Sequence, residues 1–181
     1  MYNTEAPRFP EYIDGEYHRI STVTLPAFAG MQVTNGCYGA ISSSEPSIGE
    51  THATSDKSLD PEVFRAVVKW VVENDAKIRE LLFPALVEQY WEMRDLVIES
   101  LIDEEPDEVM PRVGEPEELA SLCGLVALHV GGMEPDGTPH FGIELGCNWE
   151  EEHGAGVRFK GLCVVESGHA SDAFLFPDQD V

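Results

Sequence analysis

The feature that most constrains the fold is an alternating strand pattern that runs directly into a turn rich in charge and glycine. Apolar side chains recur at every second position from Phe141 to Trp149, which is the period of a strand with one buried face. Three glutamates, a histidine and two glycines follow within residues 150–156. A further apolar pattern at 157–160 completes a predicted β-hairpin whose turn carries the ionisable groups.

The expected register of this hairpin decides which side chains share a face. If Trp149 pairs near Val157, then Cys147 lies opposite Phe159, although a slip of one residue would reverse every face. Cross-strand charge pairs on the polar face contribute ~0.2–1 kcal/mol each. The expected polar members are His140, Glu144, Arg158 and Lys160. The apolar face, which should pack on helices, comprises Phe141, Ile143, Leu145, Cys147, Val157, Phe159, Leu162 and Val164.

Helix signals fill the middle of the chain. Asp60 can cap a helix that begins at Pro61, and an apolar stripe at helical spacing follows. A second helical pattern runs from Ile78 to Leu101. Pro84 lies inside it and must either kink the helix or begin a new one, because proline removes one hydrogen bond and clashes with the preceding turn.

These patterns predict an α+β fold, in which an antiparallel β-sheet meander packs against a central pair of long helices. A polar loop is expected at 42–58, and a hairpin is expected around Asn35 and Gly36. A short helix is expected at 115–122. The expected strands are residues 18–25, 125–130, 139–149, 157–160 and 162–166.

The length of 181 residues suits one domain, residues 1–181, which can bury a core without a disulfide or metal. Within it we expect a loose N-terminal arm at 1–16, a helical insert at 60–104 and a C-terminal meander at 124–168. The four cysteines lack the spacing of a disulfide scaffold, so we expect reduced thiols. No signal peptide or membrane span is indicated, and a cytoplasmic protein is expected.

The net charge restricts the classes of partner. Eleven basic residues against 34 acidic residues give −23 at neutral pH. Such a chain does not suit nucleic acid or anionic membranes, since phosphate contacts require clustered lysine and arginine. The acidity either serves solubility alone or attracts a basic protein, because an acidic surface accelerates association with a cationic partner.

The acidity is concentrated between residues 99 and 118, where proline also interrupts the chain three times. A run of like charges is typical of a solvated connector between helices, and it is also compatible with a surface for a partner. The candidate partner surface comprises Asp103, Glu104, Glu105, Asp107, Glu108, Glu115, Glu117 and Glu118.

The hairpin turn provides a second candidate site, for binding rather than catalysis. A histidine beside carboxylates can move protons, but no nucleophile with a recognisable motif accompanies it, so no catalytic residue is assigned. In the simpler interpretation, the histidine satisfies backbone groups of the turn and the glutamates face water. The candidate binding residues are Trp149, Glu151, Glu152 and His153.

The spacing of two cysteines and two histidines raises the alternative of a zinc site. Cys147 and His153 are six positions apart, as are Cys163 and His169. The expected register directs Cys147 and Cys163 to opposite faces, and the intervals differ from those of zinc fingers. We therefore expect neither a metal nor another cofactor.

Residues 147–156 match the pattern C-x-W-[DE]-x-E-H-G-x-G through Cys147, Trp149, Glu150, Glu152, His153, Gly154 and Gly156. This motif resembles the signature of an uncharacterised bacterial domain family of unknown function. The resemblance covers most of the chain from about residue 20 onward, and it implies a shared fold without an established activity. The position after the tryptophan, often aspartate in this pattern, is glutamate here.

Our leading functional hypothesis is a non-enzymatic binding protein of the bacterial immunity or antitoxin type, which neutralises a basic effector through its acidic surface. The hypothesis depends on the net charge and on the lack of catalytic motifs. The alternative is a small-ligand-binding domain or hydrolase-like enzyme that uses the Trp149 hairpin. A third interpretation is a scaffold whose acidity serves only solubility.

Overall fold

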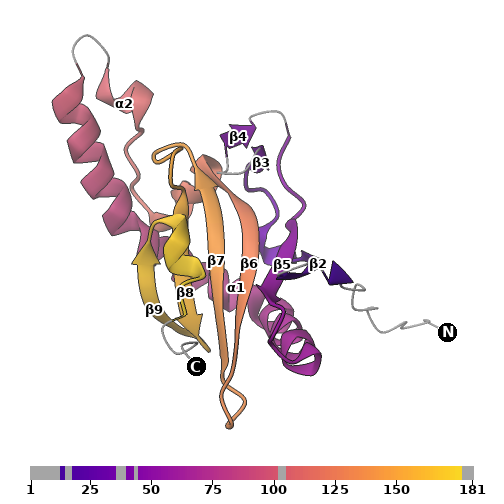
Figure 1. Ribbon diagram of the computed structural model, residues 1–181. Helices are drawn as coiled ribbons and strands as arrows, with labels where there is room; N and C mark the ends of the chain where they lie inside the picture. Colours follow the sequence, from indigo (N-terminus) through magenta and orange to yellow (C-terminus); the bar gives the residue numbers. More distant parts are fainter. Residues whose placement is uncertain (1–12, 15–17, 36–39, 43–44, 102–104, 177–181) are drawn as a thin grey trace.

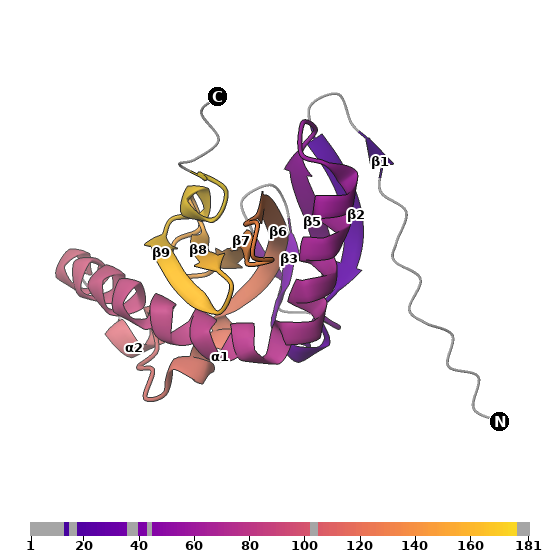
Figure 2. The same ribbon diagram turned by 90° about the horizontal axis from the view of Figure 1, so that it is seen from below.

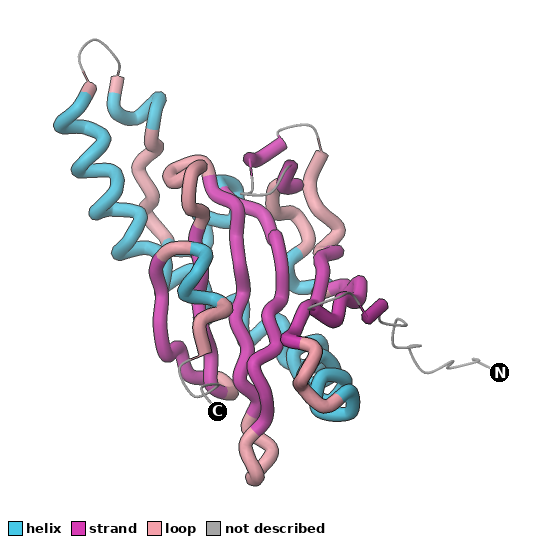
Figure 3. Tube along the Cα trace, in the orientation of Figure 1, coloured by secondary structure: helices cyan, strands magenta, loops and turns pink. Residues whose placement is uncertain are grey.

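The computed structural model describes residues 13–14, 18–35, 40–42, 45–101 and 105–176. Figure 3 shows strands side by side with helical segments around them. In chain order the elements are β1 (Ile13–Asp14), β2 (His18–Thr24), η1 (Pro26–Phe28), β3 (Val33–Asn35), β4 (Ala40–Ser42), β5 (Glu50–Asp56), α1 (Pro61–Ser100), α2 (Pro106–Val109), η2 (Pro116–Leu122), β6 (Cys123–Met133), β7 (Pro139–Cys147), β8 (Ala155–Lys160), β9 (Cys163–Gly168) and η3 (Ala170–Ala173).

The main sheet has seven strands in the order β1-β2-β5-β6-β7-β8-β9 (Figure 1). Its last four strands follow one another antiparallel, as the sequence predicted for that region. The sheet as a whole is not the predicted antiparallel meander, because β5 and β6 run parallel. Two parallel neighbours need a long crossover connection, and α1 lies within it. The α+β class is confirmed in this mixed form.

The predicted pair of long helices is wrong, because α1 is one continuous helix of 40 residues. Its start is as predicted, with the Asp60 side chain accepting a hydrogen bond from the Glu62 amide at 2.7 Å. Pro84 lies inside the helix without ending it. A proline removes only one bond from the helical ladder, and burial of Leu82, Phe83 and Leu86 around it holds the helix on the sheet.

The sequence did not predict β5, which falls within the segment expected to be a polar loop. Its buried positions are Thr51, Ala53 and Ser55, and these small side chains give little hydrophobic alternation. They fit because β5 lies between β2 and β6 with neighbours on both sides. The buried Thr51 hydroxyl donates a hydrogen bond to the Val126 carbonyl oxygen at 3.0 Å.

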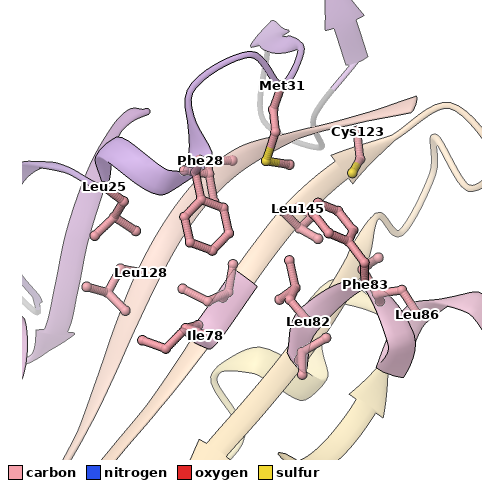
Figure 4. Close-up of a cluster of buried hydrophobic side chains, with 14 of the residues drawn as sticks. Leu25, Phe28, Met31, Ile78, Leu82, Phe83, Leu86, Cys123, Leu128 and Leu145 are labelled. Carbon is pink, nitrogen blue, oxygen red and sulfur yellow. The ribbon is translucent and has the colours of Figure 1, made fainter. Parts of the chain in front are cut away.

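The core lies between the sheet and α1. Figure 4 shows side chains of η1, α1 and the central strands converging on one cluster, including Phe28, Ile78, Leu82 and Leu145. Phe141 and Phe159 extend it, with stacked rings whose centroids are 5.1 Å apart. Burial of this many apolar side chains supplies the main driving force for folding.

The opposite face of the sheet is covered in part by η3, so the sheet has helical segments on both sides (Figures 1 and 2). Two glycines let η3 approach the strands. A Cβ atom on Gly142 would lie 1.8 Å from the Ala173 carbonyl oxygen, and one on Gly156 would lie 2.6 Å from that of His169. Side chains at these positions would therefore displace η3 from the sheet.

The β7–β8 hairpin buries the predicted side chains, but its strands pair in a register that differs from the predicted one. Phe141 pairs with Phe159, and Leu145 pairs with Ala155, so Trp149 and Cys147 lie beyond the last pair with β8. The shift is an even number of residues, which preserves the buried face of β7 and β8. Leu162 and Val164 are instead 36% and 38% exposed, because β9 is an edge strand with an irregular register against β8.

Other parts of the prediction have mixed outcomes. The hairpin around Asn35 is confirmed for the described residues, since β3 pairs with β4. The helix expected at 115–122 is the 3₁₀ helix η2. The N-terminal arm lies almost wholly outside the described residues, and the single domain stays a prediction. Within the described ranges, no helix has both the length and the apolar character needed to cross a membrane.

Candidate functional site

The turn between β7 and β8 brings Glu150 and His153 together. The Gly154 amide donates to the Glu150 carbonyl oxygen at 2.8 Å, and Gly154 has a φ of 63°, a conformation that favours glycine. This tight turn leaves His153 Nδ1 3.1 Å from Glu150 Oε1. The Glu150 side chain is 13% exposed and that of His153 is 62% exposed. The carboxylate of the pair is therefore largely buried, and the imidazole faces solvent.

A third polar side chain, His169, reaches the same turn from the segment between β9 and η3. The Ala170 amide donates to the His153 carbonyl oxygen at 3.0 Å, which ties the two segments together beside their histidines. The rings of His153 and His169 are 5.2 Å apart between centroids and nearly perpendicular. One ligand atom from each of Glu150, His153 and His169 lies within 4.8 Å of the other two. We call this group the Glu-His-His cluster.

Trp149, the first of the candidate binding residues, is buried with 5% of its surface exposed. Its ring packs edge-on against Tyr90 of α1, with centroids 5.3 Å apart. The indole Nε1 has no hydrogen-bond partner among the described residues. The ring therefore joins the turn to the core.

Two further candidate binding residues of the turn, Glu151 and Glu152, lie next to the cluster in sequence but are not members of it. Glu151 and Glu152 are exposed, and within the described residues neither forms an ion pair. The carboxylate that pairs with His153 is instead Glu150, the one glutamate of the three not proposed for binding. The sequence correctly predicted a histidine and a carboxylate in one turn. It did not show which of the three glutamates would face His153, because that depends on the backbone conformation of the turn.

The cysteines do not join His153 and His169 in the zinc site that the spacing suggested. Cys147 is buried, and this burial raises the pKa of its thiol to about 12, which disfavours the thiolate that a metal requires. Cys163 is exposed on the edge strand. Cys37 lies outside the described residues. His153 and His169 do meet, but Glu150 rather than a cysteine joins them.

The polar face of β7 and β8 is confirmed, with partners that the sequence did not identify. His129 Nε2 lies 2.6 Å from Glu144 Oε2. Glu134 accepts from Lys160 Nζ at 2.7 Å and also pairs with His140 Nε2 at 2.9 Å. The hydrogen bond from Lys160, supported by the one from His140, lowers the pKa of the Glu134 carboxyl. These side chains pair with one another, consistent with a structural role.

An open hollow lies on the same side of the sheet. It is lined by His18, His129, Phe174 and Phe176, together with part of β5. None of the residues predicted for binding lines it.

The predicted partner surface belongs to a projecting part of the molecule. The second half of α1 and the short helix α2 extend together beyond the edge of the sheet (Figures 1 and 2). We define the acidic arm as the described residues 88–101 and 105–118. Asp103 and Glu104, which the sequence included, lie outside the described residues. The exposed carboxylates of the arm are Glu88, Glu92, Asp95, Glu99, Glu105, Asp107, Glu108, Glu115, Glu117 and Glu118.

Arg94 anchors α2 to α1 within the acidic arm. Its side chain is 4% exposed and pairs with Asp107, while its Nε donates to the Met110 carbonyl oxygen at 2.9 Å. Tyr90 adds a second tie, since its hydroxyl donates to the Pro111 carbonyl oxygen at 2.6 Å. Residues 105–111 are thus held against α1 by contacts that leave most carboxylates of the arm exposed.

The fold and the two candidate sites define a mixed α+β protein with one strongly acidic projection and one Glu-His-His cluster. Residues 30–175 match the family described as a domain of unknown function, DUF6985, and the chain belongs to this family. Neither the curated proteins nor the solved structures gave a significant match to the chain.

Proposed function

We propose that this chain is a non-enzymatic binding protein of the immunity or antitoxin type, and that its acidic arm docks against a basic effector protein. The observation that carries the proposal is the concentration of exposed carboxylates on a part that projects from the sheet. A projecting acidic surface can enter or cover a cationic active site, where substrates with negative charge would otherwise bind.

The arm's own bases do little to offset this charge. Ten exposed carboxylates face two arginines, Arg94 and Arg112, across the arm. Arg94 is buried and forms an ion pair with Asp107. Arg112 Nε lies 3.4 Å from Oδ1 of the same carboxylate. Arg79, outside the arm, pairs with Glu117. Among the described residues, the remaining carboxylates of the arm form no ion pair, so their charge is available to a partner.

Apolar contacts are also available on the arm. Leu96 is 63% exposed and Val109 is 39% exposed, both within the acidic stretch. Protein interfaces combine a small apolar centre with a polar rim, and the apolar contacts supply affinity that charge alone does not. The charges would then govern the rate of encounter, which electrostatic steering raises by ~10-fold to 10³-fold at low salt.

The proposal is tested by capture of partners from the native host lysate over a series of salt concentrations, followed by mass spectrometry. We expect one cationic protein in stoichiometric amount at low salt, with its yield falling as salt rises. A Glu152→Ala/His153→Ala double variant should capture the same protein equally well. The lack of any stoichiometric cationic partner at every salt concentration would contradict the proposal.

A second candidate function is a small-ligand-binding or hydrolase-like activity at the β7–β8 turn. One observation favours it: a histidine and a half-buried carboxylate lie within hydrogen-bond distance there. Of its four predicted residues, Trp149 is buried, so the candidate now depends on His153 with Glu150. The lack of any captured partner at every salt concentration would favour this second candidate over the acidic arm.

A further inference from the structure

We propose that Glu150, His153 and His169 form a binding site for a divalent transition-metal ion of the zinc type. The site is separate from the acidic arm and stands independently of the proposed function. It joins the β7–β8 turn to the segment that leads into η3, two parts of the chain that the sheet brings together.

The distances within the cluster suit a common ion. Two ligand atoms that each lie about 2.0–2.2 Å from zinc, at the angles of tetrahedral or octahedral coordination, are about 3.0–3.5 Å from one another. His153 Nδ1 and Glu150 Oε1 are already 3.1 Å apart. One ligand atom from each of the three residues lies within 4.8 Å of the other two, and rotation of the exposed His169 imidazole can shorten the remaining distances.

Contacts of the backbone bring the segments that carry the three ligands together. The bond from the Ala170 amide to the His153 carbonyl oxygen fixes the two histidine-bearing segments side by side. Gly156 permits that approach, because a Cβ there would lie 2.6 Å from the His169 carbonyl oxygen. The Glu150 side chain is largely buried, with only 13% of it exposed, and this burial limits its movement. A partly ordered ligand set reduces the entropy lost on binding.

The donor atoms select the class of ion. Two imidazole nitrogens and one carboxylate oxygen suit zinc and its first-row neighbours, whereas calcium and magnesium favour sets of oxygen ligands. The surroundings favour a cation as well, since Glu151 and Glu152 are exposed next to the cluster. Three protein ligands leave at least one coordination position for water or for an external ligand.

The direct test is calorimetric titration of Zn²⁺ into untagged, chelator-stripped protein, with the visible absorption of bound Co²⁺ as a second readout. An untagged chain is essential because a polyhistidine tag would bind the same ions. We expect one ion per chain and a rise in the thermal unfolding temperature, because an ion that binds only the folded chain stabilises it.

Variants assign the ligands. His153→Ala, His169→Ala and Glu150→Gln should each weaken Zn²⁺ binding by at least ~10-fold and change the Co²⁺ spectrum. His52→Ala serves as the matched control, because His52 is an exposed histidine on β5 and should leave binding unchanged. Unfolding of each metal-free variant in urea confirms that the fold is retained.

Two results would overturn the site. The first is wild-type protein that binds Zn²⁺ no more tightly than the His153→Ala/His169→Ala double variant. The second is a single bound ion whose affinity and Co²⁺ spectrum are unchanged in all three ligand variants, which would place the ion elsewhere.

Discussion

Trp149 closes the buried row of β7, and its surroundings lead to a prediction at the scale of one residue. Trp149→Ala should lower the free energy of unfolding by ~3–5 kcal/mol, because the ring is 5% exposed and packs edge-on against Tyr90. Trp149→Phe should cost less than ~1.5 kcal/mol, since it keeps an aromatic ring and removes a buried donor without a partner. Urea denaturation measures both. Equal losses for the two variants would show that ring burial is not what stabilises the turn.

Glu134 provides a prediction about pH. Its pKa is lowered below the ordinary value of 4.5, chiefly by the Lys160 hydrogen bond and then by that of His140. A carboxyl with a lowered folded-state pKa contributes stability above its unfolded value, and loses it as the pH falls through the folded value. The contribution should therefore begin to fall near pH 4.5 and be lost once the pH lies below the lowered folded-state pKa. Thermal unfolding between acidic and neutral pH should show a smaller wild-type advantage over Glu134→Gln at the acidic end, and a constant advantage would contradict this assignment.

Residue patterns predicted some of these features and not others. The alternation in β7 and β8 identified the buried face correctly, since an even error in register leaves every side chain on its own face. The Glu-His-His cluster was not predictable from its spacing. Glu150 and His169 are far apart in sequence, and the bond that ties their segments runs between backbone atoms of His153 and Ala170, which carry no side-chain signal.

At the scale of elements, the association of α2 with α1 depends on Arg94. Arg94→Met should lower the free energy of unfolding by ~1–3 kcal/mol, because it leaves the Met110 carbonyl oxygen without its donor while keeping the apolar stem. Arg112→Met is the matched control, since this side chain is 72% exposed and its loss should change stability by less than ~0.5 kcal/mol. Chemical denaturation compares the two. Similar values for both variants would mean that the arm is not anchored by Arg94.

The seating of η3 on the sheet gives a second prediction for elements. Gly156→Ala should destabilise the protein by ~1–3 kcal/mol, because the new Cβ would meet backbone carbonyl oxygens of His169 and Ala170 that have little room to move. Gly114→Ala should change stability by less than ~0.5 kcal/mol, since its nearest neighbour is the flexible Glu118 side chain at 3.8 Å. Thermal unfolding distinguishes them. A neutral Gly156→Ala would show that η3 can shift without cost.

Two errors of element prediction share a physical origin. β5 was missed because Thr51, Ala53 and Ser55 are buried without being strongly apolar, and only their neighbours in the sheet make that favourable. α1 was predicted as two helices because the apolar stripe that follows Pro61 and the stripe from Ile78 to Leu101 form separate patterns, and Pro84 is unfavourable inside the second, whereas burial along both halves stabilises the whole helix. In each case tertiary packing outweighed a local preference.

At the scale of the whole molecule, charge and shape coincide. The chain carries −23, and its acidic arm projects beyond a sheet whose polar face is satisfied by internal pairs. Acidity spread evenly over the surface would point to solubility alone. Its concentration on a projection with exposed Leu96 and Val109 is what favours a protein partner.

The central claim is tested most directly by the association rate with the captured partner, measured against ionic strength for three proteins. Wild type is compared with an arm variant, Glu92→Gln/Glu105→Gln/Glu108→Gln, and with a control, Glu45→Gln/Glu50→Gln/Glu73→Gln. Both variants remove three exposed carboxylates, but only the first removes them from the arm. We predict an association rate ~10-fold lower for the arm variant at low salt, with the control close to wild type and the difference vanishing at high salt. Equal rates for the two variants would contradict docking through the acidic arm.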